Sequence, residues 1–120
     1  EIVIKSLWLD WDGIATIDKN SSLFHKEHTG EDNSSYHKGD SWFWINNLTA
    51  LVLYKLDKNK FKKYINRILN ASTEEILWKG AIGHHSELSS ASNLKSQGCL
   101  MQAWSNAMYI ELIIEIYKRT

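Results

Sequence analysis

The chain has 120 residues, the length of one ordinary domain. Hydrophobic residues make up 43% of it and include six Trp, so it can form a core and is not of the disordered class. Fourteen basic and fourteen acidic residues cancel, which argues against a nucleic-acid or membrane-surface binder. One Cys excludes an internal disulfide framework and a cysteine-rich zinc site, and no apolar run is long enough to span a membrane.

The chain starts at Glu1 without a Met and without the layout of a signal peptide. We therefore expect a fragment of a longer, cytoplasmic protein. Residues 2–17 carry β-branched and aromatic residues in partial alternation, which predicts short strands or extended segments. Pro is absent, and the turn-forming residues gather in 18–40 and 80–98, so two long irregular loops are predicted there.

A helix is predicted over residues 41–56, with Asp40 or Ser41 as its N-cap. This segment is apolar on nearly all sides, which indicates burial on most faces. Residues 57–70 place apolar side chains on one face and basic ones on the other, as in an outer amphipathic helix. Six basic residues between 55 and 67 are then a solvated face rather than a phosphate-binding patch.

Two further helices complete the predicted map. The capping-box signature over 72–75 predicts a short helix that ends near Gly80. The last helix runs from about Gly98 to Lys118 and is again apolar on most faces. Because 120 residues cannot easily bury two such helices, we expect either a homo-oligomer through exposed apolar helix faces or neighbours lost by truncation.

Two polar clusters have ordinary explanations. Asp10 and Asp12 follow an apolar run, in partial similarity to the nucleophile loop of haloacid-dehalogenase-like phosphatases, but no βα repeat follows, and a turn between two short strands is favoured. The histidines, together with Glu87, could supply metal ligands, but their spacing matches no recognised zinc pattern. We expect neither a metal nor another cofactor. The histidines are His25, His28, His37, His84 and His85.

Two other features are open to a functional interpretation. Five aromatic or imidazole rings lie within nine residues where a polar loop enters a helix, and such rings suit either the apolar C–H faces of sugars or an ordinary core. They are Tyr36, His37, Trp42, Phe43 and Trp44. Glu87 lies in an irregular loop before a buried helix, where a carboxylate could activate water or simply lie at the surface.

Two motifs in the chain resemble a known family. Residues 36–44 resemble the Tyr-His-x-Gly-x-x-Trp-x-Trp signature of glycogen debranching enzymes. Ser86-Glu87-Leu88 and residues 98–105 resemble the Glu-containing loop and the Gly-Cys-x-x-Gln-Ala-Trp-Ser helix start of the same family. Order and spacing match the C-terminal amylo-α-1,6-glucosidase region over residues 16–118. The family usually has Pro after the first Trp, where this chain has Phe43.

This resemblance implies a mainly α fold, here a partial (α/α)6 barrel with short β strands near the N-terminus, and a single unit over residues 1–120. It also implies an inverting cleavage of α-1,6-linked glucose from a glycogen-like α-glucan, with Glu87 matching the general base. Positions matching the sugar site or its support are Tyr36, His37, Trp42, Trp44, Gln102 and Trp104.

The chain departs from a complete enzyme of this kind in two ways. It is too short for twelve helices, and nothing in residues 1–40 matches the surroundings of the family's general acid. We therefore expect the remainder of the barrel upstream in the native chain, and an isolated piece without activity. A non-catalytic carbohydrate-binding or scaffolding domain and a helical interaction module are the alternatives, and no nucleic-acid or membrane partner is expected.

Overall fold

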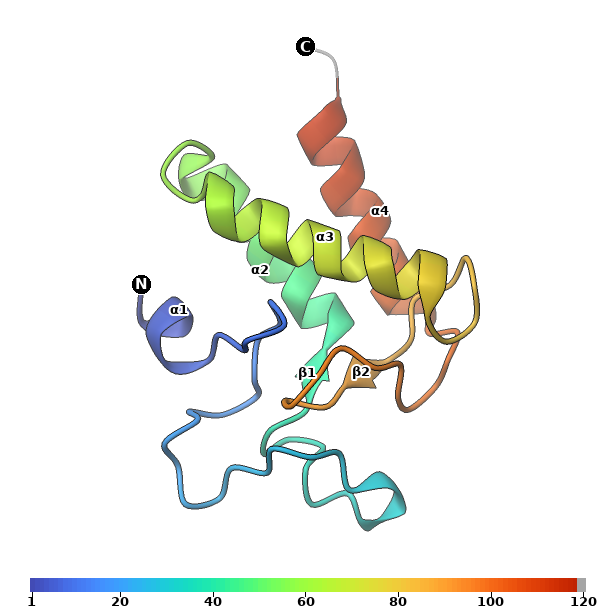
Figure 1. The fold of residues 1–120 in the computed structure, drawn as a ribbon. Coiled ribbons are helices and arrows are strands. Elements are labelled where there is room, and N and C mark those ends of the chain that lie inside the picture. The colour runs from blue at the N-terminus through green and yellow to red at the C-terminus, as the bar shows by residue number, and fades with distance from the viewer. Residues whose placement is uncertain (119–120) are drawn as a thin grey trace.

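The computed structural model describes residues 1–118, in which helices and two very short strands are joined by long loops (Figure 1). The elements are α1 (Ile2–Ser6), a 3-10 turn (Gly30–Asp32), β1 (Ser41–Trp42), α2 (Phe43–Asp57), α3 (Lys62–Trp78), β2 (Leu88–Ser89) and α4 (Ala103–Tyr117). The mainly helical expectation is confirmed for these residues. The two strands of the described sheet lie outside the predicted N-terminal stretch: β1 directly precedes α2, and β2 lies in the loop between α3 and α4.

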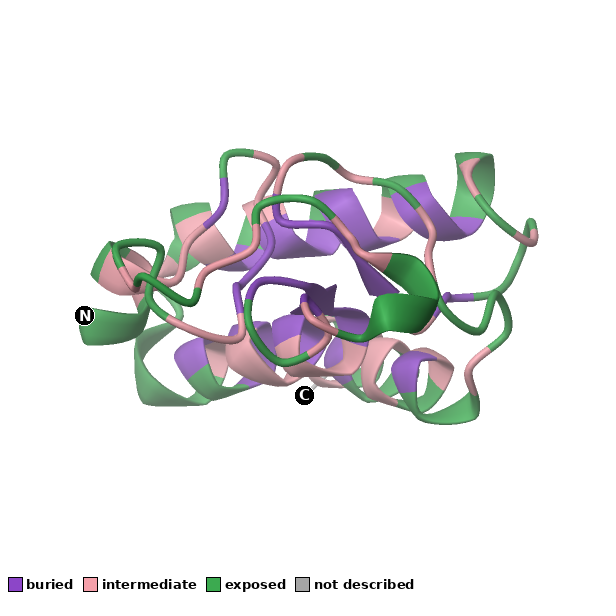
Figure 2. Ribbon diagram, turned by 90° about the horizontal axis from the view of Figure 1, so that it is seen from below, coloured by how far each residue is buried: buried purple, intermediate pink, exposed green. Residues whose placement is uncertain are grey.

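Helix α2 is the central element, since it packs against both α3 and α4. The contacts of α2 with α3 and with α4 are apolar, because each helix places hydrophobic residues on the face that meets its neighbour. The buried cluster consists of Ala50 and Leu51 from α2, Ile68 and Leu69 from α3, and Leu112 from α4. Buried positions lie on the sides of the helices that face the interior and at the strand pair, while the outer turns are exposed (Figure 2).

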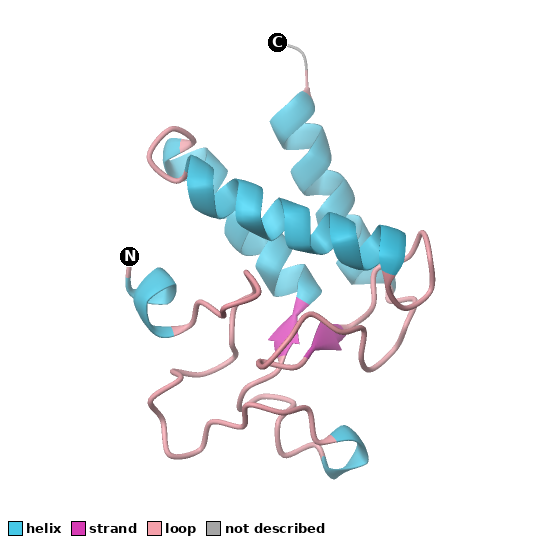
Figure 3. Ribbon diagram, in the orientation of Figure 1, coloured by secondary structure: helices cyan, strands magenta, loops and turns pink. Residues whose placement is uncertain are grey.

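The long loops gather at one end of the helices, beside the strand pair (Figure 3). There β1 and β2 pair antiparallel, with Ser41 opposite Ser89 and Trp42 opposite Leu88. This pairing joins the loop that precedes α2 to the loop that precedes α4. The two predicted irregular stretches therefore meet at this strand pair.

Residues 2–6 form a helix, so the prediction of strands there is wrong. Within residues 1–118 no strand pairs with this segment, and local bonds such as Leu7 N–H to the Val3 carbonyl (2.9 Å) satisfy its backbone groups instead. The turn predicted around Asp10 and Asp12 is confirmed. It is closed by a bond from Leu9 N–H to the Gly13 carbonyl (2.9 Å) and flanked by a single antiparallel bridge between residues 8 and 14.

Helix α2 begins one to two residues later than predicted, and neither predicted cap residue caps it. Trp42 precedes the first helical residue and makes no side-chain capping bond. Asp40 is engaged elsewhere, because its Oδ2 accepts hydrogen bonds from Ser35 and from His28, each at 2.8 Å. Ser41 belongs to β1, and its hydroxyl bonds the side chain of Asn46.

The two helices predicted between residues 57 and 80 are one continuous helix, α3. No Gly or Pro interrupts residues 62–78, so the backbone has no reason to break. The capping-box residues turn inward instead: Ser72 donates to Asn47 Oδ1 at 2.8 Å, and Glu75 binds the loop that follows α3. The amphipathic face predicted for the first half is confirmed by buried Ile65, Ile68 and Leu69.

Helix α4 starts at Ala103 rather than Gly98 and has neighbours on only one side within residues 1–118. Ser105 and Leu112 are its buried residues, while Ile110, Ile114 and Tyr117 are more than half exposed. The all-round burial predicted for this helix is therefore not met by the described residues. No described helix combines the length and apolar character that crossing a bilayer requires.

We expect Leu112→Ala to lower the free energy of unfolding by about 2–5 kcal/mol, because Leu112 is fully buried at the junction of α2, α3 and α4. Urea denaturation followed by circular dichroism measures the loss. Ile114→Ala, on the exposed side of the same helix, is the matched control and should change stability by about 0.5 kcal/mol or less. Equal losses for the two variants would contradict this packing.

Candidate active site

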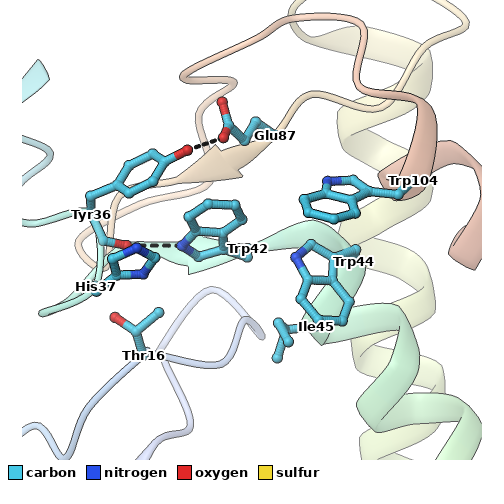
Figure 4. Close-up of a pocket in the computed structure, with 8 residues that line it drawn as sticks. All are labelled: Thr16, Tyr36, His37, Trp42, Trp44, Ile45, Glu87 and Trp104. Carbon is cyan, nitrogen blue, oxygen red and sulfur yellow. Dashed lines mark hydrogen bonds between the residues drawn. The ribbon is translucent and has the colours of Figure 1, made fainter. Parts of the chain in front are cut away.

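A cavity of about 440 Å³ lies where the loop end of the molecule meets the starts of α2 and α4 (Figure 4). Its volume is in the range of small-molecule pockets. The residues around it come from four chain segments that are far apart in sequence. They are Thr16, Tyr36, His37, Trp42, Trp44, Ile45, Glu87 and Trp104.

Glu87 supplies the one carboxylate among these lining residues, and it is held on both oxygens. The hydroxyl of Tyr36 donates to Oε1, and the backbone N–H of Cys99 donates to Oε2 at 3.0 Å. Gly98 makes room for this arrangement, because a Cβ there would lie 2.5 Å from Oε2 and its φ of +67° favours glycine. The carboxylate therefore has a defined direction, toward Tyr36 and the pocket.

The backbone of Glu87 is fixed as well. Its N–H donates to the Cys99 carbonyl at 2.8 Å, and its carbonyl accepts from the N–H of Phe43 at 3.2 Å. Phe43 is the first residue of α2, a position that Pro also favours. A Pro has no N–H, so the departure from the resembled family gives this chain one additional bond to the Glu87 loop.

Aromatic rings form two walls around the carboxylate (Figure 4). On one side His37 stacks on Trp42, with ring centroids 5.5 Å apart and planes 5° apart, and Tyr36 meets the same indole edge-on at 4.5 Å. The indole N–H of Trp42 donates to the Tyr36 carbonyl at 2.9 Å and locks this wall. On the other side Trp44 and Trp104 face one another at 5.5 Å.

The environment of Tyr36 keeps its phenol protonated. Burial, followed by the hydrogen bond to Glu87 and the negative charges of Glu87 and Asp40, raises the pKa of Tyr36 to about 12. A protonated phenol is a permanent donor to the Glu87 carboxylate near neutral pH. The pair thus presents an oriented carboxylate within largely apolar walls, which suits the activation of a water molecule beside a sugar ring.

The structure brings together six of the seven residues proposed from the sequence. Glu87, Tyr36, His37, Trp42, Trp44 and Trp104 all line the cavity. Gln102 lies outside the lining: its backbone N–H donates to the His85 carbonyl at 3.0 Å, and its side-chain oxygen accepts from Ser105. Its contacts place it in support of the Glu87 loop.

The other polar residues weighed as ligands or nucleophiles lie outside the cavity. Within residues 1–118, no group of three or more His, Cys, Asp or Glu side chains could hold a metal ion. His28 and His85 are each paired with a carboxylate, those of Asp40 and Glu75. Asp12 forms an ion pair with Arg67 on the basic side of α3.

Sequence reasoning missed two lining residues and a buried network behind the pocket. Thr16 and Ile45 are small or aliphatic and carry no distinguishing local pattern. The sequence pattern predicts a helix cap for Glu75 and an ordinary loop position for His85, whereas the two form a buried pair. Only the packing of α3 against the Glu87 loop reveals its role, so no spacing within the sequence could have identified it.

Comparison with known protein families finds one family model that matches this chain. The family model described as amylo-alpha-1,6-glucosidase matches residues 3–111, which is most of the chain. Neither the curated proteins nor the solved structures contain a significant match. The matched range includes both motifs that carry the sequence resemblance and every residue that lines the cavity.

We expect Glu87→Gln to lower the pKa of Tyr36 from about 12 toward, but not to, the ordinary value of 10.0. The amide keeps the shape of the side chain and removes its charge, while burial, the largest cause of the shift, remains. NMR titration of ring-labelled tyrosines, with Tyr36→Phe to assign the signal, measures the change. A Tyr36 pKa that is the same in the variant and the parent chain would contradict the contact.

Proposed function

The chain belongs to the amylo-alpha-1,6-glucosidase family, and we propose that it is the C-terminal part of a glycoside hydrolase that cleaves α-1,6-glucosidic branch points of a glycogen-like α-glucan. The observation that carries the proposal is the oriented Glu87 carboxylate within a cavity lined by aromatic rings. A family match by itself would indicate only the class of enzyme, whereas the site identifies the residues that could carry out the reaction.

In the proposed inverting reaction Glu87 is the general base. One of its oxygens accepts a proton from a water molecule as the water attacks the anomeric carbon, while a carboxylic acid on the opposite face of the sugar protonates the leaving oxygen. Such a pair of carboxyl groups stands about 6.5–9.5 Å apart, leaving room for the water. Tyr36 and the Cys99 N–H keep Glu87 in one orientation, so the base is prepared before the substrate binds.

The aromatic walls are the proposed sugar contacts. A glucose ring has apolar C–H faces and polar edges, and the Trp44–Trp104 pair offers flat surface beside the carboxylate. Trp104 is about half exposed, at 55%, so it can contact an incoming chain end. His37, stacked on Trp42, offers ring nitrogens at the opposite wall.

The proposed architecture is a segment of an (α/α)6 barrel. Exposed apolar side chains on α2 and α4, among them Val52, Leu56, Ile110 and Ile114, fit helices that have further helical neighbours in the native chain. The remainder of that barrel would also supply the general acid. A homo-oligomer through the same faces is the alternative arrangement.

A second candidate function is carbohydrate binding without catalysis. It is favoured by one observation: Glu87 is the only acidic residue among those that line the cavity, all of which lie in the described part of the chain. An inverting hydrolase needs two carboxyl groups, whereas a sugar-binding site needs only the rings and a few polar groups. Turnover by the full chain separates the two functions.

We expect Trp104→Ala to weaken binding of an isomaltose-containing oligosaccharide by about twofold to twelvefold, because loss of one aromatic face costs about 0.5–1.5 kcal/mol. Isothermal titration calorimetry measures the change. Trp78→Ala is the matched control, since Trp78 is 77% exposed and lies outside the cavity. Equal effects of the two variants, or none for Trp104, would remove the sugar contact from the proposal.

We expect Glu87→Gln to reduce glucose release from a branched α-glucan with single α-1,6-linked stubs by about 10²–10⁴-fold, the usual contribution of a general base. Oligosaccharide binding should persist, because the amide is similar in shape. The measurement uses the full native chain that contains these residues, with the exposed Glu74→Gln as control. Undiminished release from the Glu87 variant would exclude Glu87 as the base.

A further inference from the structure

A buried carboxylate behind the pocket contacts both chain segments that surround Glu87. Glu75 extends from α3 into the interior and is fully buried. Its Oε2 accepts a hydrogen bond from Nδ1 of His85 at 2.6 Å, and its Oε1 accepts from the hydroxyls of Ser86, at 2.6 Å, and Ser96. A carboxylate inside a protein is tolerated when donors satisfy it in this way.

The first segment leads directly into Glu87. His85 and Ser86 precede it and are both fully buried. His85 is also held from its other side, because its Nε2 lies 3.0 Å from the side-chain amide of Asn47, which donates to it. Asn47 in turn accepts from Ser72 at 2.8 Å, so a continuous network ties the segment to both α2 and α3.

The second segment holds the far side of the Glu87 carboxylate. Ser96 is followed by Gln97, whose N–H donates to the Leu88 carbonyl at 2.9 Å. Two residues later the backbone N–H of Cys99 donates to Glu87 Oε2. Through its contact with Ser96, Glu75 therefore also fixes the segment that orients this carboxylate.

We infer that Glu75 is a positioning residue for Glu87: its contacts with residues 85, 86 and 96 hold the two segments together and thereby set the direction of the Glu87 carboxylate. Glu75 does not line the cavity, so it acts only through these neighbours. The positioning rests on the contacts alone, whereas its catalytic meaning rests on the proposed function. Burial by itself would raise the pKa of Glu75, but hydrogen bonds from His85, Ser86 and Ser96 outweigh it and leave that pKa lowered.

The phenol of Tyr36 reports where the Glu87 carboxylate lies, because the two groups hydrogen-bond directly. We expect Glu75→Ala to displace Glu87 and to lower the pKa of Tyr36 from about 12 by part of the shift from 10.0. Glu75→Gln keeps an acceptor for His85 and should restore most of the shift. NMR of ring-labelled tyrosines in the 120-residue chain, assigned with Tyr36→Phe, measures all three proteins.

Thr73→Val is the matched control for a general loss of stability. It lies on the same helix and loses hydroxyl bonds to Tyr109 and to the Leu69 carbonyl, but it touches neither segment. Its Tyr36 pKa should equal that of the parent chain. Where Glu75→Ala does not fold, Ser86→Ala replaces it, and we expect exchange of the Glu87 amide hydrogen to become about tenfold faster.

An unchanged Tyr36 pKa in folded Glu75→Ala, or unchanged Glu87 exchange in Ser86→Ala, would overturn the inference, as would an equal shift in Thr73→Val. The test is independent of turnover. Retained turnover in Glu87→Gln refutes the proposed function without altering these outcomes. Where both proposals hold, Glu75→Ala lowers kcat in the full native chain and leaves KM nearly unchanged.

Discussion

The pairing of β1 with β2 is the contact on which the site depends. It involves only two residues from each strand, yet it joins segments more than forty residues apart, as the register of Ser41 with Ser89 shows. The Phe43 N–H extends the pairing by one bond to the Glu87 carbonyl. Because Trp42 and Glu87 lie at this junction, the aromatic wall and the carboxylate meet wherever the pairing forms. This two-residue strand pair therefore positions the site residues more precisely than the loops alone would.

The sequence identified the parts of the molecule whose signal is local. The helix over 41–56 and the amphipathic face of 57–70 follow from periodicity, and Glu87 follows from its motif. What failed was the assignment of boundaries and caps. The residues over 72–75 form a correct capping signature, but their side chains find partners on α2 and on the Glu87 loop, and tertiary contacts outweighed the local preference. The prediction of strands over residues 2–6 failed because, among the described elements, no strand pairs with this segment, which forms local helical bonds instead.

The interior beside the site is more polar than a core built for stability alone. Asn46, Asn47, Glu75 and His85 are all buried to within 1% exposure, and each has hydrogen-bond partners. Such hydrogen bonds are directional, because they weaken steeply when donor and acceptor depart from their preferred distance and angle. Its position directly behind Glu87 is where a defined direction matters most. The apolar cluster of α2, α3 and α4 lies farther along the helices and holds the three helices together by apolar burial.

The two kinds of exposed apolar surface on the molecule have different explanations. Among the residues that line the cavity, His37 and Trp104 are exposed, while the ring of Trp42 is buried and keeps its wall in place. Along the outer side of α4, by contrast, exposed apolar side chains recur at positions 110, 114 and 117, away from the residues that line the cavity. A surface of that composition fits the packing of another helix, whereas rings beside an oriented carboxylate fit a sugar. The same chain therefore presents one face suited to recognition and another suited to further helical packing.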